Sequence, residues 1–421
     1  MNSRPPRSTP HPATRLTRRD FVRTGATAAA ALAVPALAAS PLFASPRRAA
    51  GLRILILGGT SFLGPAVIES ALSRGHTITT FNRGITETRK GDRFPDVEKL
   101  RGDRDPDKGE GLKALAGRQW DAVVDTSGYY PRLVKASAEL LAPNVKQYVF
   151  ISSVSAYRDT DKPNSDETAP VAVIDDPTVE NMGPGMAYYG ALKHLCEQAA
   201  EAAMPGRVTN IRPGYIVGPG DGTDRYTYWP VRVQQGGEVL APGAPSDPIQ
   251  IIDVRDLGQW IVHMIEKNST GLFNAVGPAE TLTIGAALES AVRVSRSDAK
   301  LTWVPADFLE ANPDPTGQGG YLPIWLPPAG QYAGFHTWSN ARAVKHGLTF
   351  RSIDDINRSL IEWWPGEVTR RVEATEQIIQ EARDKGEEPP RLADPRQLRA
   401  GLKPEREKEL LQRWRERQRT G

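Results

Sequence analysis

A tyrosine and a lysine four residues apart, Tyr189 and Lys193, are the residues of this sequence best suited to move a proton. In a helix this spacing places the phenol and the ammonium group on one face, one turn apart. A free tyrosine has a pKa of ~10, so it acts as a base near neutral pH only when a nearby cation stabilises the phenolate and lowers that pKa. The pair therefore predicts a site at which a substrate hydroxyl group is deprotonated.

A glycine-rich segment, GGTSFLG at residues 58–64, follows an apolar run at 53–57 and leads into a helix-like stretch at 62–74. Glycines permit a tight turn between a strand and a helix. The free N–H groups and the dipole at the N-terminus of the helix attract a phosphate group. The segment therefore predicts a turn that binds the pyrophosphate of a dinucleotide.

Three further segments extend these signals along the chain: SSVSAY at 152–157, NIRPGYIVGPG at 210–220 and DVRDL at 253–257. With the glycine-rich turn and the Tyr-x-x-x-Lys pair, their order and spacing resemble the extended short-chain dehydrogenase/reductase family, which is similar to the NAD-dependent epimerases and dehydratases. The resemblance covers about residues 53–267. In the family's T-G-x-x-G-x-x-G loop, Gly58 and Gly64 match the first and last glycines, whereas Ser61 replaces the middle one.

The resemblance implies catalytic roles for three residues. Ser153 matches the family's catalytic serine or threonine, Tyr189 is the base, and Lys193 also holds the ribose of the nicotinamide. The serine hydroxyl is expected to hydrogen-bond the reacting oxygen and to fix its position. Dehydratases of this family carry Asp-Glu directly after that position, where this chain has Val154 and Ser155, so a dehydratase of that type is disfavoured.

The resemblance also implies a nicotinamide dinucleotide cofactor. NAD enzymes usually carry an acidic residue after the second strand to hold the ribose 2′-hydroxyl. This chain has Asn82 and Arg83 there, and an arginine suits the 2′-phosphate of NADP, so the choice between NAD and NADP stays open; Arg83 is equally compatible with an ordinary surface loop. The expected cofactor-binding residues are Gly58, Thr60, Ser61, Phe62, Leu63, Gly64, Asn82, Arg83, Asp103, Arg104, Thr126, Ser127, Tyr189, Lys193 and Pro213.

The expected substrate is a small sugar or sugar derivative. Nucleotide-sugar enzymes of the family use an arginine to grip the diphosphate, and its position here is Ile249. Arg225 is an alternative grip, although an ordinary loop charge fits it as well. Large aromatic residues serve as platforms for sugar rings or fill cores; the ones considered for the first role are Tyr228, Trp229 and Trp325. Histidines without ligand spacing and a single cysteine predict no metal site.

Short apolar runs alternate with helix-like segments over the first part of the chain. Strands are expected at 53–57, 77–81, 122–125, 147–151 and 208–212, and helices at 62–74, 131–141 and 189–203. This alternation predicts an α/β fold with a doubly wound, Rossmann-like parallel sheet. We expect a dinucleotide-binding domain at 51–212, a smaller C-terminal α/β substrate region at 213–365, and a charged helical tail at 366–421.

The N-terminus has the form of a twin-arginine signal peptide. Arg18 and Arg19 precede an alanine-rich apolar stretch that is too short to span a bilayer, and the segment is expected to end near residue 38. We therefore expect the twin-arginine export machinery as a partner, no membrane span in the mature form, and a periplasmic or extracellular location. Residues 1–38 hold six Arg and one Asp, a net charge of +5, so the chain without them has a net charge near −2 rather than +3. This charge does not indicate binding to nucleic acid.

The expected reaction follows from this location. An exported enzyme has little soluble nicotinamide to exchange with, whereas an epimerase oxidises and then reduces its sugar on one retained cofactor. The prediction is thus a redox-neutral, epimerase-like oxidoreductase that transfers hydride at a sugar hydroxyl carbon. The alternatives are an NADP-dependent reductase or dehydrogenase, and a non-catalytic binding protein on the same fold. The oligomeric state stays open, with a homodimer as one option.

Overall fold

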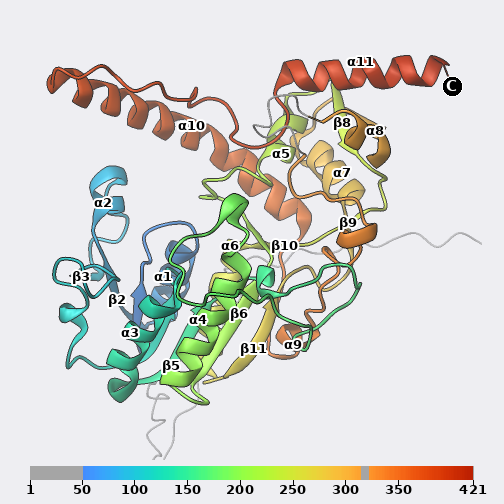
Figure 1. Cartoon of the computed structure of the whole chain (residues 1–421). Helices are drawn as coiled ribbons and strands as arrows, with labels where there is room; N and C mark the ends of the chain where they lie inside the picture. The colour runs from blue at the N-terminus through green and yellow to red at the C-terminus, as the bar shows by residue number, and fades with distance from the viewer. Residues whose placement is uncertain (1–50, 314–321, 421) are drawn as a thin grey trace, which may run out of the picture. The chain divides into compact units, whose positions relative to one another are not determined.

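The inner strands of the central sheet bury both of their faces, because successive side chains point in opposite directions and helices cover each side. In β1 (Arg53–Leu57), Ile54 and Ile56 join the hydrophobic cluster on one side of the sheet, and Leu55 and Leu57 join the cluster on the other side. Figure 1 shows this arrangement in a computed structural model that describes residues 51–313 and 322–420.

The sheet has seven strands, which pair in parallel in the order β11-β6-β5-β4-β1-β2-β3. Beside β1, they are β2 (Thr77–Asn82), β3 (Glu98–Arg101), β4 (Trp120–Asp125), β5 (Val145–Ile151), β6 (Val208–Pro213) and β11 (Gly271–Ala275). The strand order reverses direction between β1 and β4, so a crevice is expected at the carboxyl ends of these two strands. The predicted doubly wound, Rossmann-like sheet is confirmed.

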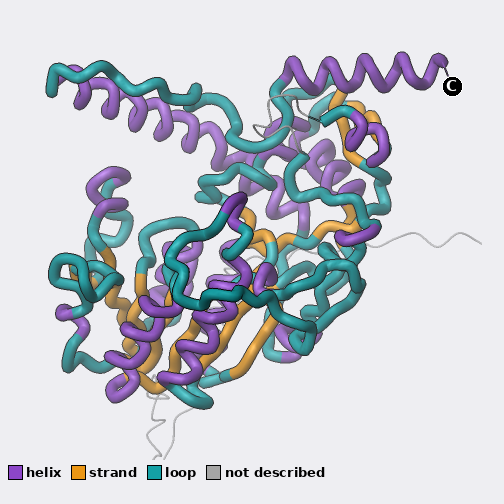
Figure 2. The backbone as a smooth tube through the Cα atoms, viewed as in Figure 1, coloured by secondary structure: helices purple, strands orange, loops and turns teal. Residues whose placement is uncertain are grey.

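Helices cover both faces of the sheet (Figure 2). On one face α1 (Leu63–Ser73) packs against α6 (Val254–Glu266), and on the other α3 (Pro131–Leu141) packs against α4 (Tyr189–Ala203). The predicted bounds of α3 and α4 agree with the structure, and α1 is one residue shorter at each end than predicted. The sequence analysis did not predict β3 and β11, which form the two edges of the sheet.

A second hydrophobic core lies in the C-terminal part of the described chain. It is enclosed mainly by α5 (Tyr228–Gln234), α7 (Ile284–Ser295) and α10 (Ile353–Asp384), with the paired strands β8 (Glu238–Pro242) and β13 (Lys300–Val304). The shorter elements are α2 (Ile85–Lys90), α8 (Ala306–Ala311), α9 (Ala341–Lys345), β7 (Tyr215–Val217), β9 (Pro248–Ile249), β10 (Ile251–Asp253) and β12 (Leu282–Thr283), and the 3-10 helices η1 (Lys113–Leu115), η2 (Ala142–Asn144), η3 (Val154–Ala156), η4 (Pro184–Met186) and η5 (Gly330–Tyr332).

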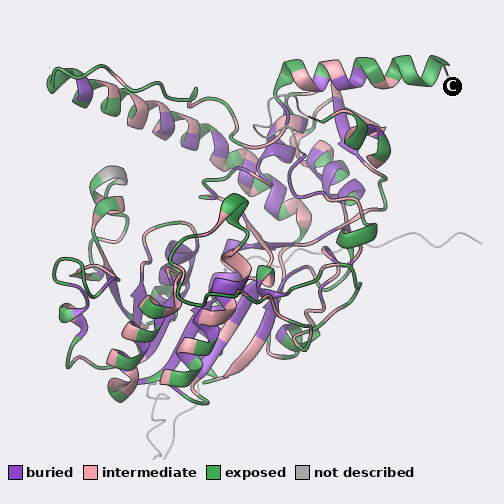
Figure 3. Ribbon diagram, viewed as in Figure 1, coloured by how far each residue is buried: buried purple, intermediate pink, exposed green. Residues whose placement is uncertain are grey.

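The charged C-terminal region forms the end of α10 and all of α11 (Pro404–Thr420). Leu410 and Leu411 of α11 are buried in the second core, and the ring of Trp414 meets Phe308 edge-on with their centroids 5.2 Å apart. The other faces of α11 are largely exposed in Figure 3. This region is therefore attached to the body through one apolar face, as its sequence pattern indicates.

Residues 1–50, which include the predicted export signal, lie outside the described residues. Within the described ranges, none of the helices combines the length and the apolar character needed to cross a membrane.

Candidate active site

A cavity of about 850 Å³ opens at the carboxyl ends of the sheet strands, at the place where the strand order reverses. Every residue named in advance for cofactor binding or catalysis lines this cavity except Gly64. The residues come from the turns that follow β1, β2, β3, β4 and β5, from the start of α4 and from the end of β6. The fold thus brings together residues that are far apart in the sequence.

The glycine-rich turn adopts a backbone that needs glycine. Gly58 and Gly59 have φ angles of 98° and 82°, which side-chain-bearing residues rarely adopt. A Cβ at Gly64 would stand 2.4 Å from the backbone of Gly59, so Gly64 allows α1 to approach the turn rather than lining the cavity itself. No side chain caps the N-terminus of α1, whose free N–H groups therefore suit a pyrophosphate. Ser61, in place of the family glycine, lines the cavity and is exposed.

The turn after β2 carries two predicted residues with different surroundings. The Asn82 side-chain amide donates to the Gly58 carbonyl at 3.2 Å, while its oxygen accepts from the Gly84 backbone at 2.7 Å, so Asn82 braces the glycine-rich turn. Arg83 is exposed at the cavity edge, and no carboxylate of the described residues forms an ion pair with it. Its guanidinium is therefore free to meet an anion at the end of β2.

Arg104 lines the cavity but is engaged in a buried ion pair. Its guanidinium donates two hydrogen bonds of 2.5 Å to the carboxylate of Asp125, which is fully buried at the end of β4, and a third of 3.0 Å to the Ser127 hydroxyl. Burial acts to raise the pKa of Asp125, but the charge and hydrogen bonds of Arg104, together with hydrogen bonds from Tyr148 and the Ser127 backbone, outweigh it and lower that pKa. Arg104 therefore shapes the cavity wall rather than offering a free charge.

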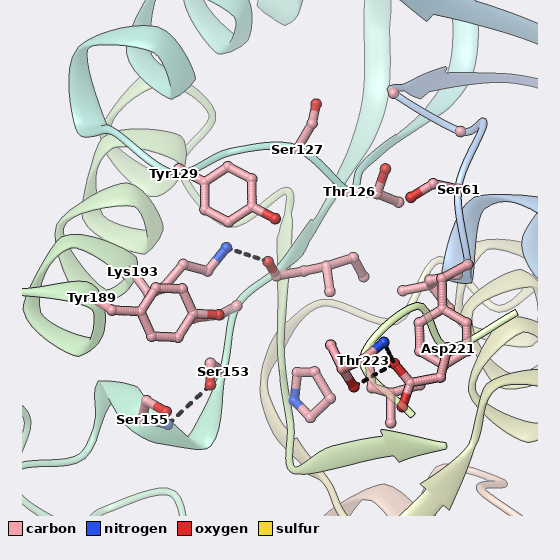
Figure 4. A pocket seen from close by; sticks show the side chains of 18 of the residues that line it. Ser61, Thr126, Ser127, Tyr129, Ser153, Ser155, Tyr189, Lys193, Asp221 and Thr223 are labelled. Atoms are coloured by element: carbon pink, nitrogen blue, oxygen red, sulfur yellow. Dashed lines mark hydrogen bonds between the residues drawn. The ribbon is translucent and has the colours of Figure 1, made fainter. Parts of the chain in front are cut away.

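The three predicted catalytic residues face one side of the cavity (Figure 4). Ser153 lies two residues after the end of β5. Its hydroxyl oxygen accepts a hydrogen bond from the Ser155 backbone N–H at 3.1 Å and so caps the N-terminus of η3. Tyr189 lies in the first turn of α4. A Cβ at Gly190 would stand 1.9 Å from the Ser155 carbonyl oxygen, so this glycine lets α4 lie directly against the serine turn. That close approach brings the phenol and the hydroxyl together.

Lys193 is buried, and its ammonium donates to the carbonyls of Gly128 at 2.8 Å and Ile151 at 2.6 Å. Burial lowers its pKa to about 8. Burial also raises the pKa of Tyr189, although hydrogen bonding with Ser153 and the charge of Arg225 act in the opposite direction. The expectation that Lys193 lowers the pKa of Tyr189 is therefore not met, because the phenol is desolvated and the ammonium points at backbone carbonyls.

Aromatic residues that the sequence analysis did not single out form much of the remaining wall: Tyr129, Tyr130, Tyr215, Phe335 and Trp338. Trp338 is held by stacking on Tyr157 with the ring centroids 4.3 Å apart. Tyr215 begins the short strand β7, and the others lie on the loop after β4 and between η5 and α9, where no periodic pattern marks them. Only the three-dimensional fold shows that their rings meet at one cavity.

The aromatic residues considered as sugar platforms lie elsewhere. Tyr228 and Trp229 are 1% exposed and Trp325 is 8% exposed in the second core, and none of them lines the cavity. The Trp229 indole donates to the Pro323 carbonyl at 2.8 Å, and the Trp325 indole donates to Asp247 at 2.8 Å. That interpretation was wrong, because large aromatic rings gain more from filling a core than from facing water.

Cys196 lies one turn after Lys193 on α4 and is fully buried. Burial raises the pKa of its thiol to about 12. Among the described residues, no group of His, Cys, Asp and Glu side chains is arranged to hold a metal ion.

The sheet order and the glycine-rich turn at its switch point define the class: a Rossmann-like α/β protein with a dinucleotide-type cavity. Sequence comparison then gives the family. The model of the NAD dependent epimerase/dehydratase family matches residues 54–276, more than half of the chain, and the protein belongs to that family.

Individual curated proteins share about a quarter of their aligned residues with this chain. The chain is 27% identical over 238 residues to the chloroplast stem-loop binding protein of 41 kDa b of Arabidopsis thaliana. This alignment covers 53% of this chain and 58% of that protein. It is 26% identical over 252 residues to the epimerase family protein SDR39U1 of Bos taurus, covering 55% of this chain and 76% of the relative. Thus the similarity to the plant protein spans little more than half of that protein's length.

Solved structures support the fold. The Bordetella bronchiseptica enzyme WbmG, solved with NAD and UDP, superimposes with a TM-score of 0.54 at 16% identity, over 76% of this chain and 96% of that one. UDP-N-acetylglucosamine 4-epimerase from Bacillus cereus gives a TM-score of 0.51 at 15% identity, over 74% of this chain and 99% of that one. At these identities the likeness concerns the architecture.

Proposed function

We propose that this protein is a nicotinamide-dependent, epimerase-like oxidoreductase that acts at a hydroxyl-bearing carbon of a sugar or sugar derivative. One observation carries the proposal: Ser153, Tyr189 and Lys193 face the same cavity as the glycine-rich turn at the start of α1. A dinucleotide held by that turn and extended over the ends of β1 and β4 would bring its reactive ring towards these three side chains.

Each side chain has a task that its position supports. The Tyr189 phenol oxygen takes the proton of the substrate hydroxyl group, and the Ser153 hydroxyl holds that oxygen in place. The Lys193 ammonium uses two of its three N–H groups on backbone carbonyls, so the third is available for a ribose hydroxyl. A bound nicotinamide would supply the hydride acceptor. Rebinding of the ketone with its other face forward would complete an epimerisation.

The free guanidinium of Arg83 supports NADP as the cofactor. The turn after β2 presents this exposed charge and no acidic side chain directly after the strand. An arginine there binds a 2′-phosphate, whereas NAD enzymes place a carboxylate there for the 2′-hydroxyl. Because Arg83 favours NADP, an NADP-dependent reductase or dehydrogenase is the second candidate function of this site.

The export proposal rests on the sequence at residues 1–38. A protein that leaves the cytoplasm folded can carry a nicotinamide cofactor with it. A redox-neutral reaction then needs no supply of fresh cofactor, so we infer that turnover proceeds on the cofactor retained in the cavity.

The proposed function is tested by purifying the protein and asking whether nicotinamide co-purifies, by mass spectrometry of the denatured material. The phenol is then removed with Tyr189→Phe, which leaves the ring in place. Turnover of a trial sugar is expected to fall at least ~100-fold, because proton transfer by a positioned side chain contributes about that much, while nicotinamide content stays unchanged. Full activity in this variant, or a protein that binds no nicotinamide, would contradict the proposal.

A further inference from the structure

Arg225 brings a positive charge to the wall of the cavity across from the catalytic residues. Its Nε donates to the Thr223 hydroxyl at 2.9 Å, and its guanidinium lies over the ring of Tyr215, 5.0 Å from the centroid. Thr223 and Tyr215 line the same cavity, and Figure 4 shows Thr223 opposite Tyr189 and Ser153. The guanidinium is thus held by a hydroxyl and an aromatic face, which leaves its terminal amino groups available.

No carboxylate of the described residues forms an ion pair with Arg225. The nearby Asp221 is engaged with Thr223 instead, accepting from its backbone N–H at 2.9 Å and its hydroxyl at 2.6 Å. Elsewhere in the lining, Arg104 is paired with Asp125 and Lys193 meets carbonyls, whereas Arg83 lies at the end of β2. Near the catalytic residues, Arg225 is therefore the cation left to bind an anion.

The loop that carries Arg225 is fixed on both sides. Asp224, which is fully buried, accepts hydrogen bonds of 2.7 and 2.5 Å from Arg371 of α10 and one of 3.0 Å from the Arg399 backbone. The buried hydroxyl of Tyr226 donates to Asn357 at 2.9 Å. A charge held this firmly on the cavity wall is suited to select a ligand, because little ordering remains to be done when the ligand binds.

The usual handle of a nucleotide sugar is missing. Ile249, which stands at the family's diphosphate-gripping position, is 1% exposed in the second core. The charge of Arg225 also acts on the reacting centre itself, since it is one of the influences that lower the pKa of Tyr189. Because Arg225 and Tyr189 line the same cavity, an anion bound by Arg225 shares that cavity with the reacting carbon.

We propose that the substrate is an acidic sugar, a uronic acid, whose carboxylate pairs with Arg225 while a neighbouring hydroxyl group meets Tyr189. This inference rests on the proposed function and adds the substrate class to it. A guanidinium binds a carboxylate through two parallel hydrogen bonds, which fixes the orientation of the ring as well as its position. The aromatic side chains around the cavity cover the apolar face of that ring.

The test measures binding of D-glucuronate and D-galacturonate to the nicotinamide-loaded full chain, by calorimetry and by the shift in melting temperature. D-glucose and D-galactose are the neutral counterparts, and UDP-glucose represents the diphosphate. At least one acid is expected to bind better than its neutral counterpart. Arg225→Gln is expected to weaken that binding about 10- to 100-fold, since hydrogen bonds between charged groups are worth that much. Arg225→Lys, a point charge without the fork, is expected to recover part of it.

The control variant is Arg342→Gln. Arg342 also lies over an aromatic ring, 5.2 Å from the centroid of Phe273, but it does not line the cavity. It is expected to bind the acids as the unaltered protein does. Equal binding of acidic and neutral sugars, no binding of any acid, an acid affinity unchanged in Arg225→Gln, or a dependence on Arg225 seen only with UDP-glucose would each overturn the inference. Retained nicotinamide binding and Tyr189-dependent turnover would show that only the substrate class is wrong.

Discussion

Lys193 shows how a single side chain ties the chemistry of the site to the stability of the fold. Its ammonium is buried, and the two carbonyl acceptors only partly replace the water that burial removes. The charged form is consequently disfavoured, and the pKa falls from its ordinary 10.5 to about 8. The residue that holds a cofactor ribose in our proposal thus also imposes a cost on the folded chain at neutral pH.

This cost predicts a pH dependence of stability. Between pH 8 and pH 10.5 the unfolded chain keeps the lysine proton that the folded chain has lost, so the free energy of unfolding rises with pH across that window. Lys193→Met removes the contribution. Urea unfolding across the window is expected to show the unaltered protein gaining stability relative to the variant as the pH increases. A difference between the two proteins that is constant with pH would contradict the lowered pKa.

At this scale, the sequence predicted which residues reach the cavity better than it predicted their surroundings. Ser153, Tyr189 and Lys193 could be chosen because motif order along a parallel sheet determines which turns meet. The buried pair of Arg104 and Asp125 could not, because the partners are 21 residues apart and nothing in either segment marks the other. The raised pKa of Tyr189 depends on desolvation, which spacing along a helix does not report.

Among the elements, α4 positions Tyr189, the base in our proposal, through the contact at Gly190. Gly190→Ala would place a Cβ 1.9 Å from the Ser155 carbonyl oxygen, so α4 has to move away from the serine turn. The expected result is a loss of ~1–3 kcal/mol in the free energy of unfolding, as for other overpacked sites, together with a fall in turnover. Urea unfolding and a turnover assay on the same preparation provide the measurement.

The matched control is Gly366→Ala in α10, where an added Cβ meets no atom within 4 Å. There the substitution is expected to stabilise the protein by ~0.5–1 kcal/mol, because alanine loses less backbone entropy than glycine in a helix. If Gly190→Ala behaved like this control, the close approach of α4 would not be what positions Tyr189.

Elements with strong periodicity were the ones predicted from the sequence. β1 and α3 have the expected bounds because β1 is a short continuous apolar run before glycines and apolar residues recur at helical spacing in α3. β3 carries only half-buried and exposed side chains, EKLR, at one edge of the sheet, so its pattern resembles a loop. β11 follows α6 at the other edge, and its GLFNA sequence has a glycine and an asparagine, which are uncommon in strands.

At the level of the whole described molecule, the charged C-terminal region holds the loop that brings Arg225 to the cavity wall. Arg371 of α10 joins Asp224 across 147 residues of sequence, and both side chains are buried. The same arginine bonds Glu367 at 2.8 Å and lies over the ring of Trp364. Sequence patterns showed only a charged helix here, since an ion pair between distant segments leaves no periodic signal.

Removing Arg371 from its pair with Asp224 is expected to destabilise the protein and to loosen the loop that carries Arg225. Arg371→Met leaves the Asp224 carboxylate buried without its main partner, and a loss of ~3–5 kcal/mol in unfolding free energy is expected. The loop should also become accessible, so limited trypsin digestion is expected to cleave after Arg225 faster than in the unaltered protein. Arg370→Gln removes a more exposed neighbouring pair and is expected to cost at most ~1 kcal/mol without new cleavage. Equal digestion rates in the two variants would contradict the role of α10 in holding the loop.

The single cysteine has a consequence for the compartments in which the folded chain can exist. Exchange with glutathione or with an oxidase requires a thiolate that the reagent can reach. Cys196 offers neither, because it is fully buried and its pKa is raised to about 12. The thiol of the folded protein is therefore expected to stay reduced in both a reducing cytosol and an oxidising envelope. Passage from one compartment to the other then requires no covalent change at Cys196.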